Sequence, residues 1–407
     1  MTVTDRAAAL ALDAADPLAE MRARFALPAG VFYLDGNSLG PLPVATPARL
    51  AEVAQREWGE GLIRSWNDAG WFDAPLAVGA RIAPLLGAEA GSVVACDSVT
   101  VNIFKLAGAA LAMRPERRVI LCEADDFPTD RHVLEGLTSL AGAELRTVPR
   151  GQVPQALGPD VALVLLSHVH FATGAVHDMG ELSAAIAATG ALSLWDLSHS
   201  AGALALALDA DGADFAVGCG YKYLNGGPGA PAFAYVARRH HDSFVPPLRG
   251  WMGHAEPFGF SDHWQPAAGV RRLVAGTPGI LGLAALDCGV ATFDGVDMAA
   301  AEAKSSALVA LFGSLVAGLP GVTVEPLGAP RHGCQLIVRH PEARRVMAAL
   351  IARGVIGDMR PPDRMRFGFP ALTTRFTDAW DAAALVSDVL TRQTWREIDP
   401  DSLGPVS

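Results

Sequence analysis

The chain has 407 residues, of which 51% are hydrophobic and 18% are charged, and its formal net charge is −11. This length predicts two or three domains with a large buried core. The acidic balance and the lack of a basic tract argue against a nucleic-acid partner.

Near the N-terminus, an apolar run leads into residues 36–40, which read GNSLG and fit the G-x-S-x-G pattern of serine hydrolases. That pattern requires a helix directly after the serine, but Pro41 and Pro43 follow here and disfavour helical backbone. We expect the next helix to begin at Thr46 and Pro47. Ser38 is therefore a poor candidate nucleophile, and the glycines suit a loop that walls a pocket.

The middle of the chain alternates short apolar runs with helical patterns. Strands are predicted over residues 118–124, 144–148, 161–167, 191–195, 214–218 and 232–237, and helices over 101–113, 131–140 and 179–189. Several strands are apolar on both faces, as expected in a parallel sheet that helices cover on both sides. We predict an α/β fold in which residues 46–290 form a large, doubly wound domain around a mostly parallel mixed sheet.

The pattern changes after residue 290. A predicted helix over 299–319 precedes the strand-like segments GVTVEPL and CQLIVRH, a helix in PEARRVMAALIARG, another strand pair and a last helix in TDAWDAAALVSDVLTRQ. These elements predict a smaller α+β domain at residues 291–407. Residues 1–45 are expected to form an N-terminal segment that packs with this domain.

The cysteines indicate a reducing compartment. They form no C-x-x-C pair and most lie in apolar runs, so we expect buried free thiols at Cys96, Cys122, Cys219, Cys288 and Cys334. The N-terminal apolar segment carries acidic residues, unlike a signal peptide, and no stretch approaches the ~20 apolar residues of a membrane span. A cytoplasmic protein without membrane or nucleic-acid partners is predicted.

Two neighbouring predicted strands end in residues that together suggest cofactor chemistry. The segment LSLWDLSHSAG places Asp196 at a strand end with His199 three residues later, and DFAVGCGYKYLNGGPG places Lys222 after the next strand. Taken alone, Asp196 is more simply a strand-end cap and Lys222 a surface lysine. Open α/β sheets bind ligands at the carboxyl ends of their strands. There, an amine that forms an imine and an acid that pairs with a pyridinium nitrogen suit a pyridoxal phosphate site.

Other candidate residues for such a site also have simpler explanations. Thr100 at a predicted helix start suits a phosphate, but a threonine N-cap explains it equally well. Phe127 suits a cover for the ring, but a core phenylalanine is the simpler interpretation. The glycine-rich segment around Lys222 lacks the G-K-[ST] end of a P-loop. Since His168 and His170 have no evident third ligand, we predict no metal site.

Together these residues resemble kynureninase, a family of fold-type-I pyridoxal phosphate enzymes related to class V aminotransferases. The motifs YLDGNSLGP, RSWNDAGW, FPTD, WDLSHSAG, GYKYLNGGPG, GWMGH and RFGFPAL occur in order from about Leu34 to Leu372. GYKYLNGGPG with GWMGH is specific, whereas WDLSH is shared with aminotransferases and desulfurases. The resemblance implies hydrolysis of L-kynurenine, or of its 3-hydroxy form, to anthranilate or 3-hydroxyanthranilate and L-alanine, within tryptophan catabolism.

The resemblance also implies a cofactor site at matching positions. Lys222 would form the Schiff base with pyridoxal 5'-phosphate, and Asp196 would pair with the ring nitrogen, with His199 nearby. Tyr221, beside the lysine, is expected to shuttle protons. Phe127 would stack on the ring beside Pro128, Thr129 and Asp130, while Val99, Thr100, Ser167 and Tyr221 would surround the phosphate.

The substrate and the subunit arrangement follow from the same resemblance. Trp251 and Thr277 would reach the cofactor from a second subunit, which implies a homodimer with shared active sites. Ser38 and Trp66 would border the substrate ring, and Arg366 would grip the substrate carboxylate, a task that suits a guanidinium fork. Thr277 stands where some relatives carry asparagine, so the choice between the two substrates stays open, with kynurenine favoured.

Two alternative functions remain. Within the same fold, the chain could be an aminotransferase or a cysteine desulfurase. A desulfurase needs a reactive cysteine on a mobile loop, and neither Cys288 nor Cys334 fits that description. In a different class, a serine esterase would use Ser38.

Overall fold

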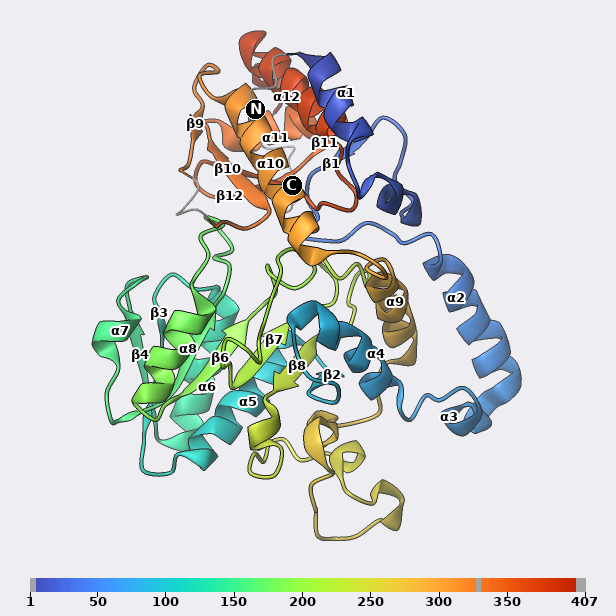
Figure 1. Ribbon diagram of the computed structural model, residues 1–407, viewed down its shortest axis with the longest axis vertical. Coiled ribbons are helices and arrows are strands. Elements are labelled where there is room, and N and C mark those ends of the chain that lie inside the picture. Colours follow the sequence, from blue (N-terminus) through green and yellow to red (C-terminus); the bar gives the residue numbers. More distant parts are fainter. Residues whose placement is uncertain (1–4, 327–330, 400–407) are drawn as a thin grey trace.

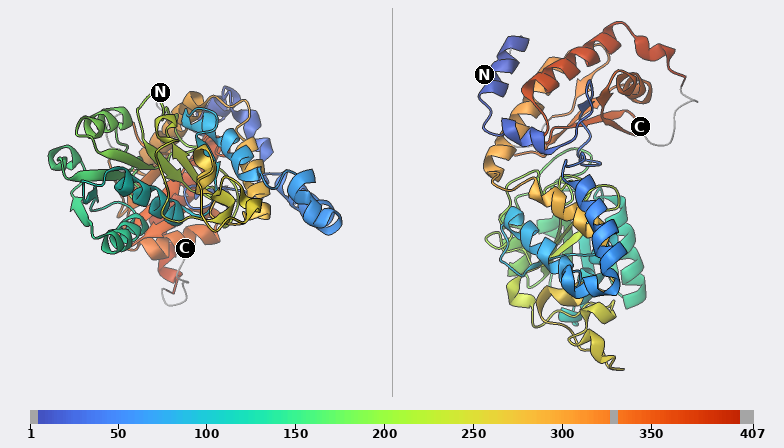
Figure 2. Two further views of the ribbon diagram at one scale, coloured as in Figure 1. Left: turned by 90° about the horizontal axis from the view of Figure 1, so that it is seen from below. Right: turned by 90° about the vertical axis from the view of Figure 1, so that its right-hand side faces the viewer.

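The computed structural model describes residues 5–326 and 331–399. Figure 1 shows a larger lobe built around one sheet and a smaller lobe to which both ends of the chain contribute. The helical arm near residues 46–68 projects from the larger lobe, as the left view of Figure 2 shows. The two lobes meet at the edge of the central sheet where the candidate site lies.

A seven-stranded mixed sheet organises the larger lobe, in the order β2-β8-β7-β6-β5-β3-β4. β8 runs antiparallel to both of its neighbours, and the other adjacent pairs are parallel. Apart from the edge strand β4, every residue of these strands is buried, because helices cover both faces. The strands are β2 (Val93–Ala95), β3 (Val119–Glu123), β4 (Glu144–Val148), β5 (Val161–Ser167), β6 (Leu192–Asp196), β7 (Phe215–Gly218) and β8 (Phe233–Val236).

Two hydrophobic clusters lie on opposite faces of this sheet. One includes Ile103 and Leu134 of α5 and α6, and the other includes Ile82, Ile186 and Leu286 of α4, α8 and α9. The helices of this lobe are α4 (Ala74–Ile82), α5 (Val99–Met113), α6 (Pro128–Ala141), α7 (Val153–Ala156), α8 (Met179–Ala188) and α9 (Ile280–Ala291). The predicted doubly wound α/β fold is thereby confirmed.

The helical arm begins with α2 (Thr46–Glu52), which continues as a π-helix over Val53–Gly61. A 3-10 turn (Leu62–Arg64) and α3 (Ser65–Asp68) complete it. Three large apolar side chains of the arm, Trp58, Leu62 and Ile63, are exposed. An exposed apolar group of this kind marks a candidate contact surface.

The smaller lobe packs helices against an antiparallel sheet in the order β12-β13-β10-β9. Its elements are α10 (Met298–Val316), β9 (Thr323–Val324), β10 (Gln335–Arg339), α11 (Ala343–Ala352), β12 (Asp358–Arg360), β13 (Arg364–Gly368) and α12 (Phe376–Thr391). Among the described helices, α10 alone is long and apolar enough to span a membrane. However, Leu308, Val309 and Phe312 of α10 are buried in the core of this lobe, so α10 serves as a core helix.

The N-terminal segment lies against the smaller lobe. α1 (Arg6–Ala14) packs on α12, and the carboxylate of Asp13 accepts the amides of Phe376 and Thr377 at 2.6 and 3.1 Å. β1 (Phe32–Tyr33) pairs in parallel with β11 (Val355–Ile356). Short 3-10 turns complete the chain at Ala19–Arg24, Ala83–Leu86, Arg238–His240, Trp251–Gly253, Pro257–Gly259, Gly269–Leu273 and Thr394–Glu397.

Most predicted elements agree with the structure, and three differences have physical causes. β2 was missed because its three residues are too few for a recognisable alternation. α5 begins at Val99 instead of residue 101, because Ser98 caps it by accepting the amide of Val101 at 3.3 Å. α6 begins at Pro128 instead of residue 131, since proline is well tolerated at the first helical position.

Candidate active site

A cavity of about 180 Å³ lies at the carboxyl ends of β5 and β6. This is the position at which open α/β sheets bind ligands. The first turns of α5 and α6 and the loop after β7 complete its wall. The predicted cofactor residues that line it are Val99, Thr100, Phe127, Thr129, Asp130, Ser167, Asp196, His199, Tyr221 and Lys222.

The amino group of Lys222 differs from the other lysine amines of the chain. The sequence contains three lysines, and Lys105 and Lys304 are buried and each ion-paired at 2.6 Å, with Asp97 and Asp16 respectively. Lys222 is half-buried, and its Nζ lies 3.0 Å from Nε2 of His199 instead of beside a carboxylate. Of the three amines, that of Lys222 lines the cavity and is not held in an ion pair with a carboxylate, so it is the one placed to form an imine.

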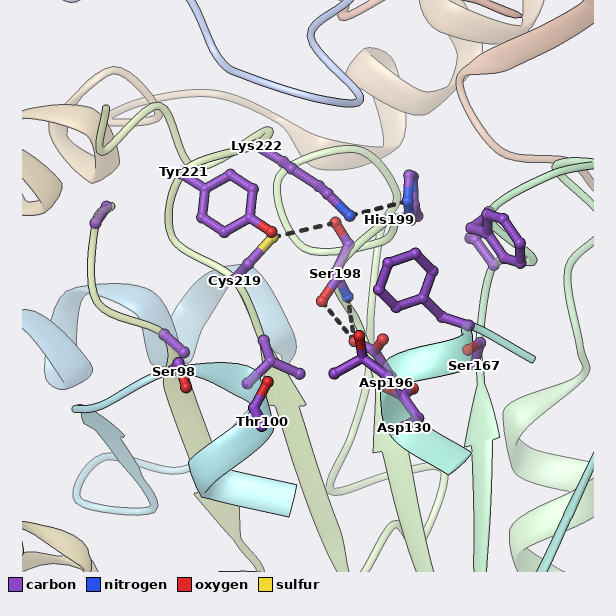
Figure 3. A pocket seen from close by; sticks show the side chains of 17 residues that line it. Ser98, Thr100, Asp130, Ser167, Asp196, Ser198, His199, Cys219, Tyr221 and Lys222 are labelled. Carbon is purple, nitrogen blue, oxygen red and sulfur yellow. Dashed lines mark hydrogen bonds between the residues drawn. The ribbon is translucent and has the colours of Figure 1, made fainter. Parts of the chain in front are cut away.

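His199 is a neutral partner for this amine. Burial, and then the positive charges of Lys222 and Arg366, hold the pKa of His199 well below its ordinary value. A neutral imidazole with its proton on Nδ1 accepts a hydrogen bond from the lysine at Nε2. Figure 3 shows the lysine amine pointing toward His199, with Asp130 and Asp196 below them in this view.

Asp130 and Asp196 form a pair of acids in the cavity wall. The side chain of Asp196 accepts the amide and the hydroxyl of Ser198 at 2.8 and 2.6 Å. Asp130 is 1% exposed, and its carboxyl oxygens have no donor among the described residues. Burial, and then the charge of Asp196, raises the pKa of Asp130 well above its usual range. This pair of acids in the wall of the cavity suits a cationic ring N–H.

The opposite electrostatic character is found at the N-terminus of α5. Val99 and Thr100 form the first turn of this 15-residue helix, where backbone amides lack partners within the helix. Such a terminus attracts an anion through its N–H groups and its dipole. The sequence left open whether Thr100 is a simple N-cap. In the structure Ser98 is the N-cap of α5, and Thr100 is the second residue of the helix. A ligand with a phosphate at one end and a pyridinium nitrogen at the other fits this charge distribution.

Phe127 has an exposed ring on the cavity wall. Its side chain is 40% exposed, and the ring centroid lies 5.9 Å from Nζ of Lys222. Phe171 packs edge-on against it at 5.2 Å and holds its orientation. This leaves one aromatic face available for a flat ring close to the lysine amine.

Tyr221 and Cys219 contribute a hydroxyl and a thiol to the same wall. Burial raises the pKa of the Tyr221 phenol far above its usual value, and burial also raises the pKa of the Cys219 thiol. Tyr221 therefore keeps its proton at neutral pH and can donate a hydrogen bond or a proton. The resemblance implies that Ser167 lies with Val99 and Thr100 at the phosphate. In the sheet, however, Ser167 pairs in register with Asp196, so it lies beside the acid pair.

Three predicted cofactor residues do not line the cavity. Pro128 is the first residue of α6, between two residues that do. Trp251 is 43% exposed in a 3-10 turn, and Thr277 lines a second cavity of about 210 Å³. Trp66, predicted at the substrate, lies on the arm and packs edge-on against Trp71 at 5.9 Å. These side chains do not complete the cavity of their own chain.

Ser38 and Arg366 meet behind the cavity wall. The guanidinium of Arg366 donates to the Ser38 hydroxyl at 3.0 Å and pairs with the carboxylate of Asp358. The Ser38 hydroxyl in turn donates to Asp358 at 2.9 Å, so it has no histidine partner as an esterase nucleophile would. The loop passes close to the lysine, since a Cβ on Gly40 would lie 2.3 Å from the carbonyl oxygen of Lys222. The close approach explains the glycine.

Sequence reasoning missed several residues at the cavity. Ser98 and Ser198 could have been found, because the first precedes a helix and the second lies two residues after Asp196, where a serine commonly bonds an aspartate. Val169, Phe171, Ala230 and Ala232 also line the cavity, and no chemical signal marks such apolar residues in advance.

Within the described residues, His168 and His170, which were considered as metal ligands from the sequence, and the cysteines have other surroundings. His168 bonds Ser200 at 2.8 Å and His170 bonds Thr173 at 2.8 Å. No group of three or more metal-ligating side chains occurs in the described ranges. The five cysteines are free and buried. Burial raises the pKa of Cys334 to about 12 and also raises that of Cys288, which disfavours a desulfurase thiolate.

Comparison with known proteins gives one family. The sequence profile described as Kynureninase C-terminal domain matches residues 301–386. Kynureninase of Burkholderia pseudomallei (strain 1106a) is 48% identical over 402 residues, which cover 96% of this chain and 97% of the relative. Kynureninase of Pseudomonas fluorescens is 47% identical over 406 residues, covering 97% and 98% respectively.

Solved structures with the same fold share less sequence. The cysteine desulfurase CsdA of Escherichia coli superposes with a TM-score of 0.78 at 18% identity, over 92% of this chain and 98% of that chain. A C-DES variant with glycine covalently linked to its PLP cofactor gives 0.77 at 18% identity, over 90% and 98%. At this identity the likeness shows the fold alone, so it does not favour desulfurase activity.

Proposed function

The chain belongs to the kynureninase family, and on this basis we propose that it hydrolyses the Cβ–Cγ bond of L-kynurenine to anthranilate and L-alanine. The observation that carries the proposal is the amine of Lys222, which lines the cavity 3.0 Å from a neutral imidazole and opposite an acid pair. L-Kynurenine is favoured over its 3-hydroxy form, although the threonine at position 277 leaves the choice between the two substrates open.

Pyridoxal 5'-phosphate is the cofactor, and when bound it supplies an electron sink for the α-carbon of an amino acid. Lys222 would hold it covalently, and Asp196, with Asp130 beside it, would accept the ring N–H. The first turn of α5, at Val99 and Thr100, would bind the phosphate. Phe127 would cover one ring face, and Pro128 would place it by starting α6.

Proton transfers fall to the groups around the lysine. Lys222 is proposed to take the α-proton of the substrate, since its amine lines the cavity and its hydrogen-bond partner is the neutral imidazole of His199. Tyr221 holds its proton at neutral pH, so we assign it the donation of a proton to the departing carbon. A water molecule would attack the γ-carbonyl. The roles of Lys222 and Tyr221 are distinct, because Lys222 acts as a base and Tyr221 acts as an acid.

Substrate binding would use the groups behind and beside the cavity. Arg366 would bind the α-carboxylate, and Ser38 would border the substrate. Trp66, Trp251 and Thr277 lie away from the cavity of their own chain, which supports a shared site in a homodimer. The exposed apolar side chains of the arm are suitable for the contact. We propose that this homodimer is cytoplasmic.

The test is turnover of L-kynurenine by the purified protein with pyridoxal phosphate. Anthranilate fluorescence and L-alanine should appear in equal amounts without an added keto acid. Dependence on a keto acid would instead indicate an aminotransferase, and labelling of Ser38 by a fluorophosphonate, without a yellow cofactor, would indicate an esterase. Release of sulfur from cysteine would indicate a desulfurase.

A further inference from the structure

The carboxylate of Asp358, on β12, is a central acceptor behind the cavity wall. Its Oδ1 accepts from Nε of Arg366 at 2.9 Å, and its Oδ2 accepts from Nη2 of the same residue. Oδ2 also accepts from Ser38 at 2.9 Å and from Arg360 at 2.8 Å. The side chains of Asp358 and Arg366 are 8% and 2% exposed, so this is a buried and nearly dry contact.

The two edges of the Arg366 fork have partners of different charge. The edge formed by Nε and Nη2 carries the two-bond pair with Asp358, which fixes the plane and rotation of the guanidinium. The remaining bonds go to neutral acceptors. Nη1 donates to the carbonyl of Phe171 at 2.8 Å, and Nη2 donates to the hydroxyl of Ser38 at 3.0 Å. The edge formed by Nε and Nη2 is therefore neutralised by a carboxylate, whereas the edge formed by Nη1 and Nη2, which is called the capped edge below, bonds neutral acceptors.

The capped edge is the one connected to the cavity. Phe171, whose carbonyl accepts from Nη1, lines the cavity. His199 also lines it, and the charge of Arg366 contributes to the low pKa of that histidine. Arg360 shares the carboxylate of Asp358, and the carboxyl of Asp35 lies close enough to interact with the charges of both guanidinium groups. On the cavity side, Arg366 nevertheless donates to neutral acceptors, the carbonyl of Phe171 and the hydroxyl of Ser38.

We propose that Asp358 is a positioning residue that holds one edge of Arg366 so that the other edge binds the α-carboxylate of the substrate. This inference rests on the proposed function. The incoming carboxylate would replace the neutral Phe171 carbonyl and Ser38 hydroxyl, and charge-assisted bonds to guanidinium are stronger than neutral ones. If the substrate carboxylate instead displaced Asp358 from Arg366, one ionic pair would be exchanged for another, with no gain in binding free energy. Asp358 therefore determines which edge is offered.

The test compares Asp358→Asn with Asp363→Asn. Asparagine keeps the shape of the side chain but cannot make the two-bond ionic pair. The KM for L-kynurenine should rise at least about tenfold in Asp358→Asn, while kcat stays within about threefold. Asp363 pairs with Arg339 at 2.6 Å in the same lobe, on a partly exposed face. Its asparagine variant is the matched control and should retain the wild-type KM.

A second probe separates positioning from damage to the fold. The amine formed by removing the α-carboxyl of kynurenine should inhibit Asp358→Asn and wild type with the same Ki within about twofold, because it lacks the group that Arg366 binds. An unchanged KM, or an equal rise in KM and in this Ki, would overturn the inference. If the wild-type protein releases no anthranilate, the proposed function fails. If it does and only the predicted KM effect is missing, the inference alone fails.

Discussion

The amino group of Lys222 lies 3.0 Å from Nε2 of His199, and the imidazole is neutral because burial and the lysine charge depress its pKa. The imidazole orients the amine at the cavity without forming an ion pair with it. This relationship leads to the first prediction.

Lys222→Ala should abolish turnover and the yellow colour of the bound cofactor. Lys222→Arg keeps a cation beside His199 but cannot form an imine, so it should fail in the same way. Visible absorption near ~420 nm after dialysis measures the loss. A normal far-ultraviolet circular dichroism spectrum is the control for folding. Retention of the band in either variant would refute the assignment of Lys222.

Asp196→Asn and Asp130→Asn should differ in effect. Burial and the charge of Asp196 raise the pKa of Asp130, which favours its protonated form, and asparagine resembles that form. Asp196 would lose the negative charge that faces the ring nitrogen. We expect kcat/KM to fall by about 100-fold or more in Asp196→Asn and by less than about tenfold in Asp130→Asn. Equal losses would contradict this division of charge.

Asp35→Asn should change the pH dependence of stability. Burial, and then the charge of Asp358, raises the pKa of Asp35 to about 6 from its model-peptide value of 3.8. The folded state thus binds this proton more tightly than the unfolded state. The stabilising contribution is complete below about pH 4 and is lost as pH rises through about 6.

Between about pH 4 and pH 8, the free energy of unfolding of the wild type should therefore fall by up to about 3 kcal/mol relative to that of Asp35→Asn. Thermal unfolding midpoints of the two proteins, compared at both pH values, measure the difference. Asp262→Asn, at an exposed position, is the control for a general change in charge. A pH-independent difference between wild type and Asp35→Asn would contradict the raised pKa.

Ser38→Ala should leave much of the activity intact. Its hydroxyl is a neutral acceptor for Arg366 and a donor to Asp358, and Arg366 keeps its other bonds without it. We expect the loss in kcat/KM with L-kynurenine to stay below about tenfold, because the net worth of one such hydrogen bond is small. Complete loss of L-kynurenine turnover in Ser38→Ala would contradict this minor role of the hydroxyl.

Mixed dimers test the proposed shared site. Lys222→Ala and Trp251→Ala should each be weakly active or inactive alone. After unfolding together and refolding as an equal mixture, about a quarter of the wild-type activity should return, because half of the dimers are mixed and each has one intact site. No recovery above the two parents would show that Trp251 does not serve the site of its partner.

Much of the fold was predictable from local patterns. The limits of β4 and β5 match the predicted residues 144–148 and 161–167. β5 is a fully buried apolar run, a pattern that marks a strand clearly. Asp196 and Lys222 could be placed near each other, because they follow neighbouring strands whose ends meet at one sheet edge. The roles of the surrounding residues came from the family resemblance.

Other features depend on contacts between distant segments. Asp358 meets Ser38 although 320 residues separate them, and no local pattern marks that pair. The isolation of the Lys222 amine also becomes visible only when Lys105 and Lys304 are seen in their ion pairs. The continuation of α2 as a π-helix has no signal in residues 53–61 that periodicity detects.

The most direct measurement is to reduce the cofactor-loaded protein with borohydride and to map the labelled peptide by mass spectrometry. Reduction makes the imine bond permanent, so the label reports which amine carried the cofactor. The account predicts one pyridoxyl group per chain, on Lys222. A label on Lys105 or Lys304, or no label on a protein that still converts L-kynurenine, would contradict it.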